Sequence, residues 1–264
     1  MKKAFYLLGA VFFCVTLQSQ AAVDQNTAKP TTFSPDQVKQ IQQIVHEYIV
    51  KNPSVLMEAG KTLQEQEAAK EKAKLETIKN NISKYKNEIF DTKAPGRIVT
   101  GNPNGKIIIA EFTQYQCPHC LSIKPLIAKL LKDNPDVQLI TIYWPFFGND
   151  AIYAAKVALA AQKQNKFNEF NQAMIAAREF MNQEKTDNVI KSIPGLDAKK
   201  LHTDMDAKEL DAGLKANFKL AQNLGIIGTP VFMFTNKEMT KFSFIPGQTP
   251  NIEEDLKQSL NTVR

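Results

Sequence analysis

Two cysteines separated by two residues are the feature of this sequence best suited to chemistry. The motif Cys117-Pro118-His119-Cys120 follows a short apolar run at residues 107–112 and precedes helical apolar spacing at residues 121–131. The pair therefore stands at a strand-to-helix junction, where two neighbouring thiols can form and exchange a disulfide. Two cysteines scattered at random over about 240 positions would lie this close only about one time in a hundred.

The position at the start of a helix predicts different roles for the two sulfurs. The first sulfur faces unpaired backbone N–H groups and the positive end of the helix dipole, which favour the thiolate. We therefore expect Cys117 to be the nucleophile and Cys120, which is less exposed, to resolve the mixed disulfide. Pro118 suits the first helical turn and keeps the loop rigid. A protonated His119 adds positive charge near Cys117 and so stabilises its thiolate. Each unit by which the pKa is lowered corresponds to about 1.4 kcal/mol of stabilisation.

Plainer interpretations of the same residues remain open. Cys117 and Cys120 could form a static structural disulfide, although closing so small a loop restricts the unfolded chain little. They could bind zinc, but zinc takes four ligands, and besides His119 only His46 and His202 remain, both far along the chain. We therefore expect no metal site. His119 could also be a solvated side chain without a role.

A carboxylate precedes the motif by six residues. Glu111 lies on the same strand face as Ile107 and Ile109. If that face points inward, the carboxylate is buried near the end of the strand, which disfavours its charged form and places a proton acceptor behind the cysteine pair. An outward-facing or salt-bridged Glu111 is the alternative.

The segment before the motif reads as two helices. Ser34-Pro35-Asp36-Gln37 combines an N-cap serine, a proline at the first helical position and a capping-box glutamine, so a helix begins here. A second helix is expected from Ser54 to about Phe90, with an apolar seam near its end. Such a helical pair cannot form a core by itself. Residues 34–90 are therefore expected to form a helical oligomerisation region, and a helix folded back on its own domain is the alternative.

A second domain follows a break in the pattern. Residues 91–105 are rich in proline, glycine and asparagine and are expected to form a linker. Residues 106–264 read as strand, helix, strand, a helical block at about 149–223, two strands and a last helix. This is the order of an α/β thioredoxin fold with an inserted helical subdomain.

The N-terminal residues predict export. Two lysines precede an apolar run over residues 4–17, and Ser19-Gln20-Ala21 offers small side chains to a signal peptidase. We expect residues 1–21 to be a signal peptide and residues 22–33 a linker. Cys14 could carry a lipid, but bulky side chains precede it where a lipidation motif requires small ones. The oxidising compartment beyond the inner membrane suits disulfide chemistry.

Composition excludes several other classes of protein. The chain is 43% apolar and 23% charged, which is enough to fill a core. Three cysteines are too few for a disulfide-dense scaffold. The net charge of +6 is spread along helices in which lysine and glutamate interleave, so we expect no nucleic-acid partner.

Together these motifs resemble the periplasmic DsbA family of bacterial thiol-disulfide oxidoreductases. The resemblance rests on Glu111-Phe112, the Cys-Pro-His-Cys motif and Thr229-Pro230 before a later strand, and it covers roughly residues 102–264. From the residues alone, Pro230 is simply a proline that begins a strand. The resemblance implies these roles: Cys117 attacks, Cys120 resolves, His119 tunes Cys117, Glu111 is the buried acid beneath the pair, Pro230 is a cis-proline facing the disulfide, and Thr229 offers backbone hydrogen bonds to an extended substrate peptide.

Two features depart from the monomeric oxidases of the family. Thr229 stands where those proteins carry valine, and threonine is the choice of the dimeric isomerases DsbC and DsbG. The segment at residues 34–90 is similar to the extended, oligomeric DsbA-like proteins, some of which were first described as outer-membrane-associated antigens. The resemblance therefore implies a homodimer or higher oligomer assembled through residues 34–90.

The activity implied is that of a periplasmic enzyme of a Gram-negative bacterium. It would form or reshuffle disulfides in unfolded or wrongly paired secreted proteins, using no cofactor besides the redox-active Cys117–Cys120 disulfide. A membrane redox partner would reset the active site. A dedicated disulfide oxidase is the first alternative, and a non-catalytic surface or chaperone-like protein is the second.

Overall fold

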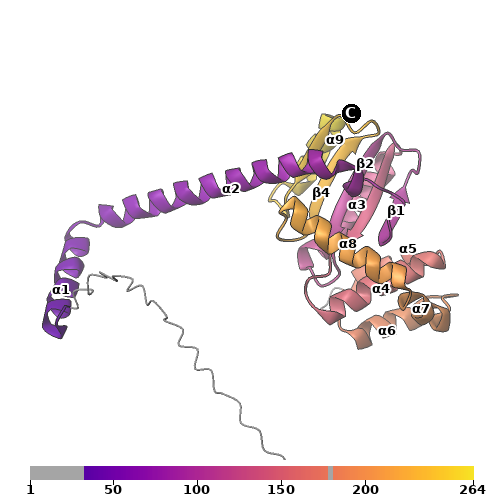
Figure 1. Ribbon diagram of the computed structural model, residues 1–264, viewed down its shortest axis with the longest axis horizontal. Coiled ribbons are helices and arrows are strands. Elements are labelled where there is room, and N and C mark those ends of the chain that lie inside the picture. The colour runs from indigo at the N-terminus through magenta and orange to yellow at the C-terminus, as the bar shows by residue number, and fades with distance from the viewer. Residues whose placement is uncertain (1–32, 178–180) are drawn as a thin grey trace, which may run out of the picture. The chain divides into compact units, whose positions relative to one another are not determined.

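The computed structural model describes residues 33–177 and 181–264 (Figure 1). The signal peptide expected at residues 1–21 lies outside the described residues, as does all but Phe33 of the linker expected at 22–33. The chain divides into two compact units, Met1–Thr62 and Leu63–Arg264. None of the described helices is both long enough and apolar enough to cross a membrane.

The first unit contains helix α1, Pro35–Lys51, and the beginning of α2, Ser54–Ile89. The expected capping box is present, since the Ser34 hydroxyl accepts the Gln37 N–H and the Gln37 side chain accepts the Ser34 N–H. No side chain of α1 is buried. The apolar stripe of α1 therefore has no cover among the described residues of the chain. Its members are Val38, Ile41, Ile44, Val45 and Tyr48.

The second unit is built on a five-stranded sheet in the order β1-β3-β2-β4-β5. β2 runs parallel to β3, and the other neighbouring pairs are antiparallel. β2 lies at the centre, and nearly all of its side chains are buried, as expected for a strand covered on both faces. The strands are β1 Arg97–Gly101, β2 Ile107–Thr113, β3 Val137–Tyr143, β4 Val231–Asn236 and β5 Phe242–Ile245.

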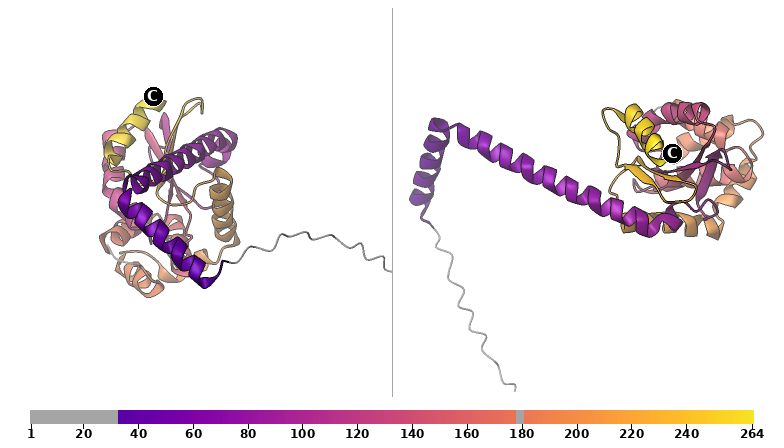
Figure 2. Two further views of the ribbon diagram at one scale, coloured as in Figure 1. Left: turned by 90° about the vertical axis from the view of Figure 1, so that its left-hand side faces the viewer. Right: turned by 90° about the horizontal axis from the view of Figure 1, so that it is seen from above.

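Helices cover both faces of this sheet. Helices α3, Pro118–Asp133, and α9, Ile252–Val263, share one core with alternate residues of β2 and β4. Helix α8, Lys208–Leu224, and the last turns of α2 share a second core with the opposite faces of β2, β3 and β4. The right-hand view of Figure 2 shows the three layers edge on. The arrangement confirms the expected thioredoxin fold.

The end of α2 is part of the sheet's own core. Ile78, Ile82 and Ile89 are buried and cluster with Ala110 and Met233 of the central strands. The seam that the sequence shows here therefore packs on the chain that carries it, as in the folded-back alternative. Among the described residues, the apolar helix face that has no cover is that of α1.

The helical block expected at about 149–223 is present, but its last helix, α8, packs on the sheet, so the insertion itself lies between β3 and α8. Its helices gather at one end of the sheet, and together with residues of the sheet's end they form a third core (Figure 1). This core includes Tyr115 and Tyr143, so the insertion packs directly beside the loop that leads to the cysteines. The inserted helices are α4 Asn149–Lys163, α5 Phe167–Ala177, α6 Gln183–Ser192 and α7 Ala198–Met205.

The structure places a strand inside the segment expected to be a linker, residues 91–105. This strand, β1, pairs with β3 at the edge of the sheet, and only Ile98 is buried among its residues. A short strand with one buried side chain carries too little apolar alternation to stand out from flanking prolines and glycines. Gly96 crosses α8 at Gly213, where a Cβ on Gly213 would lie 2.6 Å from the Gly96 nitrogen. The segment is thus fixed in place by a crossing that requires glycine.

The packing of α2 predicts where the chain can be shortened. A chain that begins at Leu63 is expected to fold, whereas a chain that begins at Asp91 is not. The second chain lacks four buried apolar side chains, each of which contributes about 1.5–3 kcal/mol, a loss comparable with the whole stability of a domain. Urea unfolding followed by circular dichroism measures the difference. Equal, cooperative unfolding of both chains would contradict this account of the core.

Candidate active site

The cysteine pair sits at the carboxyl end of the central strand. β2 ends at Thr113, and α3 begins at Pro118, with Cys117 as the N-cap residue in an extended conformation. The Cys117 sulfur accepts the backbone N–H of Cys120 at 3.3 Å, one of the donors that a helix start leaves free. Both cysteines are free thiols and both are buried, Cys117 being 4% exposed.

The loop before β4 completes the site from the other side. The Thr229–Pro230 peptide bond is cis, as the resemblance implied. Val231 pairs with Phe112, which brings the start of β4 beside the end of β2. The Cys117 thiol donates a hydrogen bond of 3.3 Å to the Thr229 carbonyl oxygen. Two segments more than a hundred residues apart thus meet at one sulfur.

The surroundings of Cys117 favour its thiolate. Its pKa is lowered from 9.0 to about 6. The largest cause is a hydrogen bond with the Cys120 side chain, and burial opposes it. Hydrogen bonds from the Thr229 side chain and the Cys120 backbone lower the pKa further, and the charge of His119 adds the smallest contribution. Hydrogen bonding to the sulfur therefore lowers the pKa of Cys117 more than the charge of His119 does, although His119 was the residue that the sequence analysis singled out.

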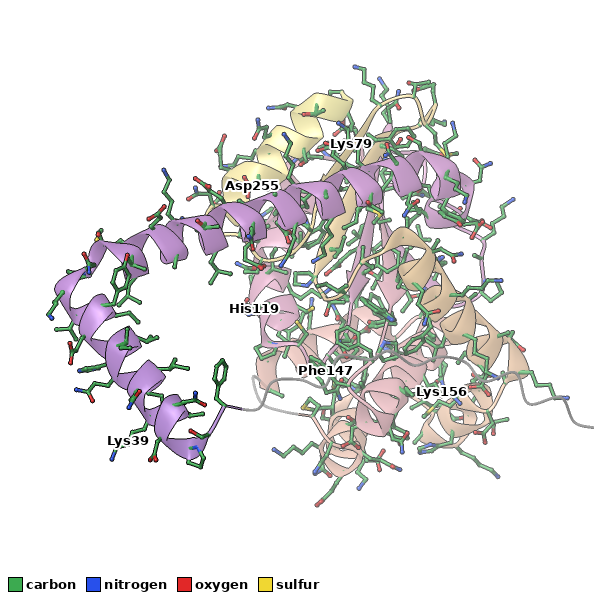
Figure 3. All side chains as sticks on the ribbon, turned by 60° about the vertical axis from the view of Figure 1, so that its left-hand side comes forward. Lys39, Lys79, His119, Phe147, Lys156 and Asp255 are labelled. Carbon is green, nitrogen blue, oxygen red and sulfur yellow. The ribbon has the colours of Figure 1, made fainter. Side chains whose placement is uncertain are left out.

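Cys120 is tuned in the opposite direction. Burial, followed by the neighbouring Cys117, raises the pKa of the Cys120 thiol well above its ordinary range. Cys120 therefore stays a thiol under conditions in which Cys117 is ionised. His119 lies on the exposed surface of the first turn of α3 (Figure 3), next to Pro118 at the first helical position.

Glu111 is both buried and salt-bridged. Its side chain is 0% exposed, and both of its carboxylate oxygens accept hydrogen bonds from Lys124 Nζ, at 2.7 and 2.8 Å. Lys124 lies on α3, four residues after Cys120, and lines a groove of about 430 Å³ between α3, α5 and the sheet. Removing one partner of a buried pair of this kind costs about 3–5 kcal/mol, because the other charge is left unpaired. The pair therefore holds α3 to the central strand.

Three residues between the strand and the motif were not anticipated from the sequence. The Gln114 side chain donates to the Thr229 hydroxyl at 3.4 Å, and the Gln116 side chain donates to the Met181 carbonyl at 2.8 Å. The Tyr115 hydroxyl bonds to that of Tyr143 at 2.8 Å. Loop residues have no periodicity from which their burial could be predicted. The one signal in the sequence is that two amide side chains, Gln114 and Gln116, stand close to the cysteine motif.

Apolar surface remains exposed close to these loops. Ile227, two residues before Thr229, is 74% exposed and lines a groove of about 230 Å³ shared with Lys74 of α2 and Gly247. Phe147 follows β3, whose end lies beside that of β2, and it is 52% exposed (Figure 3). No group of three or more metal-ligating side chains occurs among residues 33–177 and 181–264. The site offers thiols and apolar contacts.

The lowered pKa of Cys117 predicts how the reduced protein responds to pH. Alkylation of Cys117 by iodoacetamide should be half-maximal near pH 6. Because the folded pKa lies below the unfolded value, the thiolate stabilises the reduced fold fully above about pH 9. That contribution, at most about 4 kcal/mol, is lost as the pH falls to about 6. Alkylation rates and urea unfolding across this range test both effects.

The relative size of the causes that lower the pKa of Cys117 provides a control for this prediction. Replacing Cys120 with alanine should raise the pKa of Cys117 more than replacing His119 with alanine, because Cys120 contributes the largest effect and His119 the smallest. A half-maximal rate near pH 9 in the parent protein, or a larger effect of His119→Ala, would contradict this description of the site.

Comparisons with known proteins agree with the geometry. The thioredoxin family model matches residues 93–257, and that of the copper resistance protein ScsC N-terminal domain matches residues 37–70. No curated protein matches the chain.

Solved structures resemble the chain over most of its length. A thioredoxin-like oxidoreductase from Silicibacter pomeroyi is 30% identical with a TM-score of 0.59, and the match covers 66% of this chain and 95% of that one. The thiol-disulfide exchange protein alpha-DsbA2 from Wolbachia pipientis is 27% identical with a TM-score of 0.58, covering 70% and 94%. Proteus mirabilis ScsC in a transitional conformation shares the fold at 22% identity and a TM-score of 0.55, covering 88% and 99%. The chain therefore belongs to the thioredoxin family, as a thiol-disulfide oxidoreductase of the DsbA/ScsC type with an ScsC N-terminal domain.

Proposed function

We propose that this protein forms and reshuffles disulfides in secreted proteins, in the periplasm of a Gram-negative bacterium. The observation that carries the proposal is the placement of the two thiols at the start of α3, where the Cys117 sulfur accepts the Cys120 backbone N–H at 3.3 Å. In agreement with this placement, the pKa of Cys117 is lowered to about 6 and that of Cys120 is raised. A sulfur that is a stable thiolate is a good leaving group, and its disulfide is a strong oxidant. The N-terminal segment with two lysines and an apolar run supports export.

Oxidation of a substrate proceeds by two exchanges. A substrate thiolate attacks the Cys117 sulfur of the enzyme disulfide, the sulfur–sulfur bond to Cys120 breaks, and a mixed disulfide forms. A second substrate thiolate then attacks the substrate sulfur, and Cys117 leaves as the thiolate. The substrate loses two electrons, and the enzyme gains them as a dithiol. A membrane redox partner then restores the enzyme disulfide.

Reshuffling starts from the reduced enzyme. The Cys117 thiolate attacks a wrongly paired substrate disulfide and releases one substrate thiolate. That thiolate, or another, attacks elsewhere in the substrate and finally displaces Cys117, so that no net oxidation occurs. Where the substrate fails to rearrange, Cys120 attacks the Cys117 sulfur and frees the substrate in reduced form.

The substrate class that suits this site is an extended segment of polypeptide. The backbone of Thr229 would pair with such a segment, Pro230 would pack against it, and Pro118 would border the attacking sulfur. The exposed side chain of Ile227, which lines a groove, and the exposed ring of Phe147 support contacts with apolar side chains flanking the substrate cysteine. Unfolded or wrongly paired secreted proteins expose such segments.

The exposed stripe of α1 supports assembly into a homodimer or higher oligomer. Five apolar side chains along one helix face lie without cover among the described residues, and the ScsC N-terminal domain model matches this region. Two active sites held in one assembly could act on a single misfolded chain. This arrangement favours isomerase activity in addition to oxidation, and Thr229 is the residue found at this position in the dimeric isomerases.

Trapping the covalent intermediate tests the chemistry. The Cys120→Ser variant should accumulate a mixed disulfide with a cysteine-containing peptide, seen by mass spectrometry and lost on reduction. The Cys117→Ala variant should form none and should lose insulin reduction and rescue of scrambled ribonuclease. If Cys117→Ala keeps full activity in both assays, the proposed chemistry is wrong. A protein that only holds unfolded chains would suppress aggregation equally well with or without Cys117.

Shortening the chain tests the direction of exchange. The chain that begins at Leu63 keeps its buried core and should sediment as a monomer that still oxidises dithiols. It should rescue scrambled ribonuclease at least about tenfold more slowly than the full chain. If sedimentation gives the same number of chains per particle for the shortened and the full chain, α1 is not the assembly element. If the shortened chain is a monomer that still rescues ribonuclease at the full rate, reshuffling does not require assembly.

A further inference from the structure

A groove between α2 and the edge of the sheet leads away from the active site. Two hollows of about 230 and 560 Å³ follow α2, and Pro246 lines both of them. The wall opposite α2 is formed by β5 and by the loop at residues 246–249. Lys79, labelled in Figure 3, belongs to the α2 wall. The two hollows thus form one continuous groove, which we name the α2–β5 groove.

One end of the α2–β5 groove reaches the cis-proline loop. Ile227, two residues before Thr229, lines the smaller hollow. Gly247 lines the same hollow, and a Cβ on it would lie 4.0 Å from the Pro230 carbonyl oxygen. The Thr229 carbonyl in turn accepts the Cys117 thiol at 3.3 Å. A polypeptide joined to Cys117 therefore has to cross only Gly247, which has no side chain, to enter the groove.

The other end of the groove is a sheet edge. β5 is the last strand of the sheet and pairs only with β4 among the described strands. An edge strand presents a row of unpaired backbone groups to which an extended chain can add. Phe242 and Phe244 line the groove and pack, half-buried, on the core that α2 covers. Ser243 points to the opposite face, where its hydroxyl bonds to that of Ser259.

The charges that line the groove balance one another. Glu71 and Lys74 line the smaller hollow and form an ion pair at 3.7 Å, and Glu76 and Lys79 line the larger one. A wall with two charges of each sign does not select a charged partner. The groove therefore offers backbone hydrogen bonds and apolar contacts, which recognise an extended segment with little dependence on its sequence. An enzyme that acts on many unfolded chains needs this kind of recognition.

We propose that the α2–β5 groove binds the substrate polypeptide beyond its reacting cysteine. The segment crosses Gly247 and pairs with the outer edge of β5 as a sixth strand, with alternate apolar side chains under α2. This inference rests on the proposed function, because it requires a substrate bound to Cys117. Ile245 lies level with Phe232, three residues after Thr229, and β5 adds four residues, so about seven extended substrate residues span the path.

Hydrogen exchange in trapped complexes tests the proposal. The full-length Cys120→Ser variant is joined through Cys117 to one of two peptides, in which the cysteine has about eight or about two flanking residues of alternating valine and serine on each side. The long peptide should slow exchange of the β5 amides at least about tenfold, because strand pairing protects them, and the short peptide should not. The other edge strand, β1, should be unchanged by both peptides. Unprotected β5 amides with the long peptide, or equal protection of β1, would overturn the proposal.

Two matched variants of α2 test the groove itself. Ser83 and Thr77 are both exposed on α2, but Ser83 lines the larger hollow and Thr77 lines neither. In the Cys120→Ser protein, the equilibrium constant for the mixed disulfide, measured against glutathione, should be about tenfold higher for the long peptide than for the short one. Ser83→Trp should remove most of this advantage without affecting the short peptide, and Thr77→Trp should leave both values unchanged. Equal constants for the two peptides, or equal effects of the two variants, would contradict the proposal.

Failure of the proposed function gives a different result. If Cys117 does not exchange disulfides with polypeptides, neither peptide forms a mixed disulfide. If only the inference about the groove is wrong, both peptides form one with the same equilibrium constant. Protection of β5 that exists before a peptide is added, and that rises with protein concentration, would show that a second copy of this chain occupies the groove and would also overturn the proposal.

Discussion

The site depends on one constraint: a single helical turn gives two identical thiols opposite environments. At the start of α3, the first sulfur meets backbone and side-chain donors, while the second is turned into the core and cut off from solvent. The same geometry at any later turn would leave both sulfurs alike, because interior helical N–H groups are already paired. The parallel pair of β2 and β3, the loop before β4 and the ion pair beneath α3 all hold this helix start in place.

The boundary between arm and catalytic domain does not follow the boundary between helices and strands. α2 is one helix in sequence, but its last turns supply side chains that the sheet needs to be covered on both faces. An amphipathic seam can serve a partner chain or its own sheet, and its spacing is the same in both cases. α1 differs, since its apolar face has no counterpart in the described part of its own chain. Only contacts can tell the two helices apart.

Sequence was sufficient where the signal was local. The capping box at Ser34, the last helix and the strand-to-helix junction at Cys117 each depend on a few adjacent residues. Sequence was insufficient where distant segments meet. The Lys124 partner of Glu111 and the pairing of edge strand β1 depend on contacts between distant elements, which no spacing encodes. The meeting of the Thr229 loop with Cys117 was expected only from the family resemblance. Glu111 shows both cases. Its inward direction follows from the alternation of side chains along the strand, but its ion-pair partner Lys124 does not follow from any local pattern.

The low exposure of Cys117 has a consequence for survival in an oxidising environment. Thiolates are the form of cysteine that peroxides attack, and oxidation past the sulfenic acid is irreversible for most proteins. Here Cys117 is 4% exposed, and Cys120, which carries a second thiol, lies three residues away and donates its backbone N–H to the Cys117 sulfur at 3.3 Å. A sulfenic acid formed at Cys117 would condense with that neighbour to give the ordinary enzyme disulfide. Oxidation of Cys117 by peroxide would thus yield the active disulfide form of the enzyme instead of an irreversibly inactivated protein.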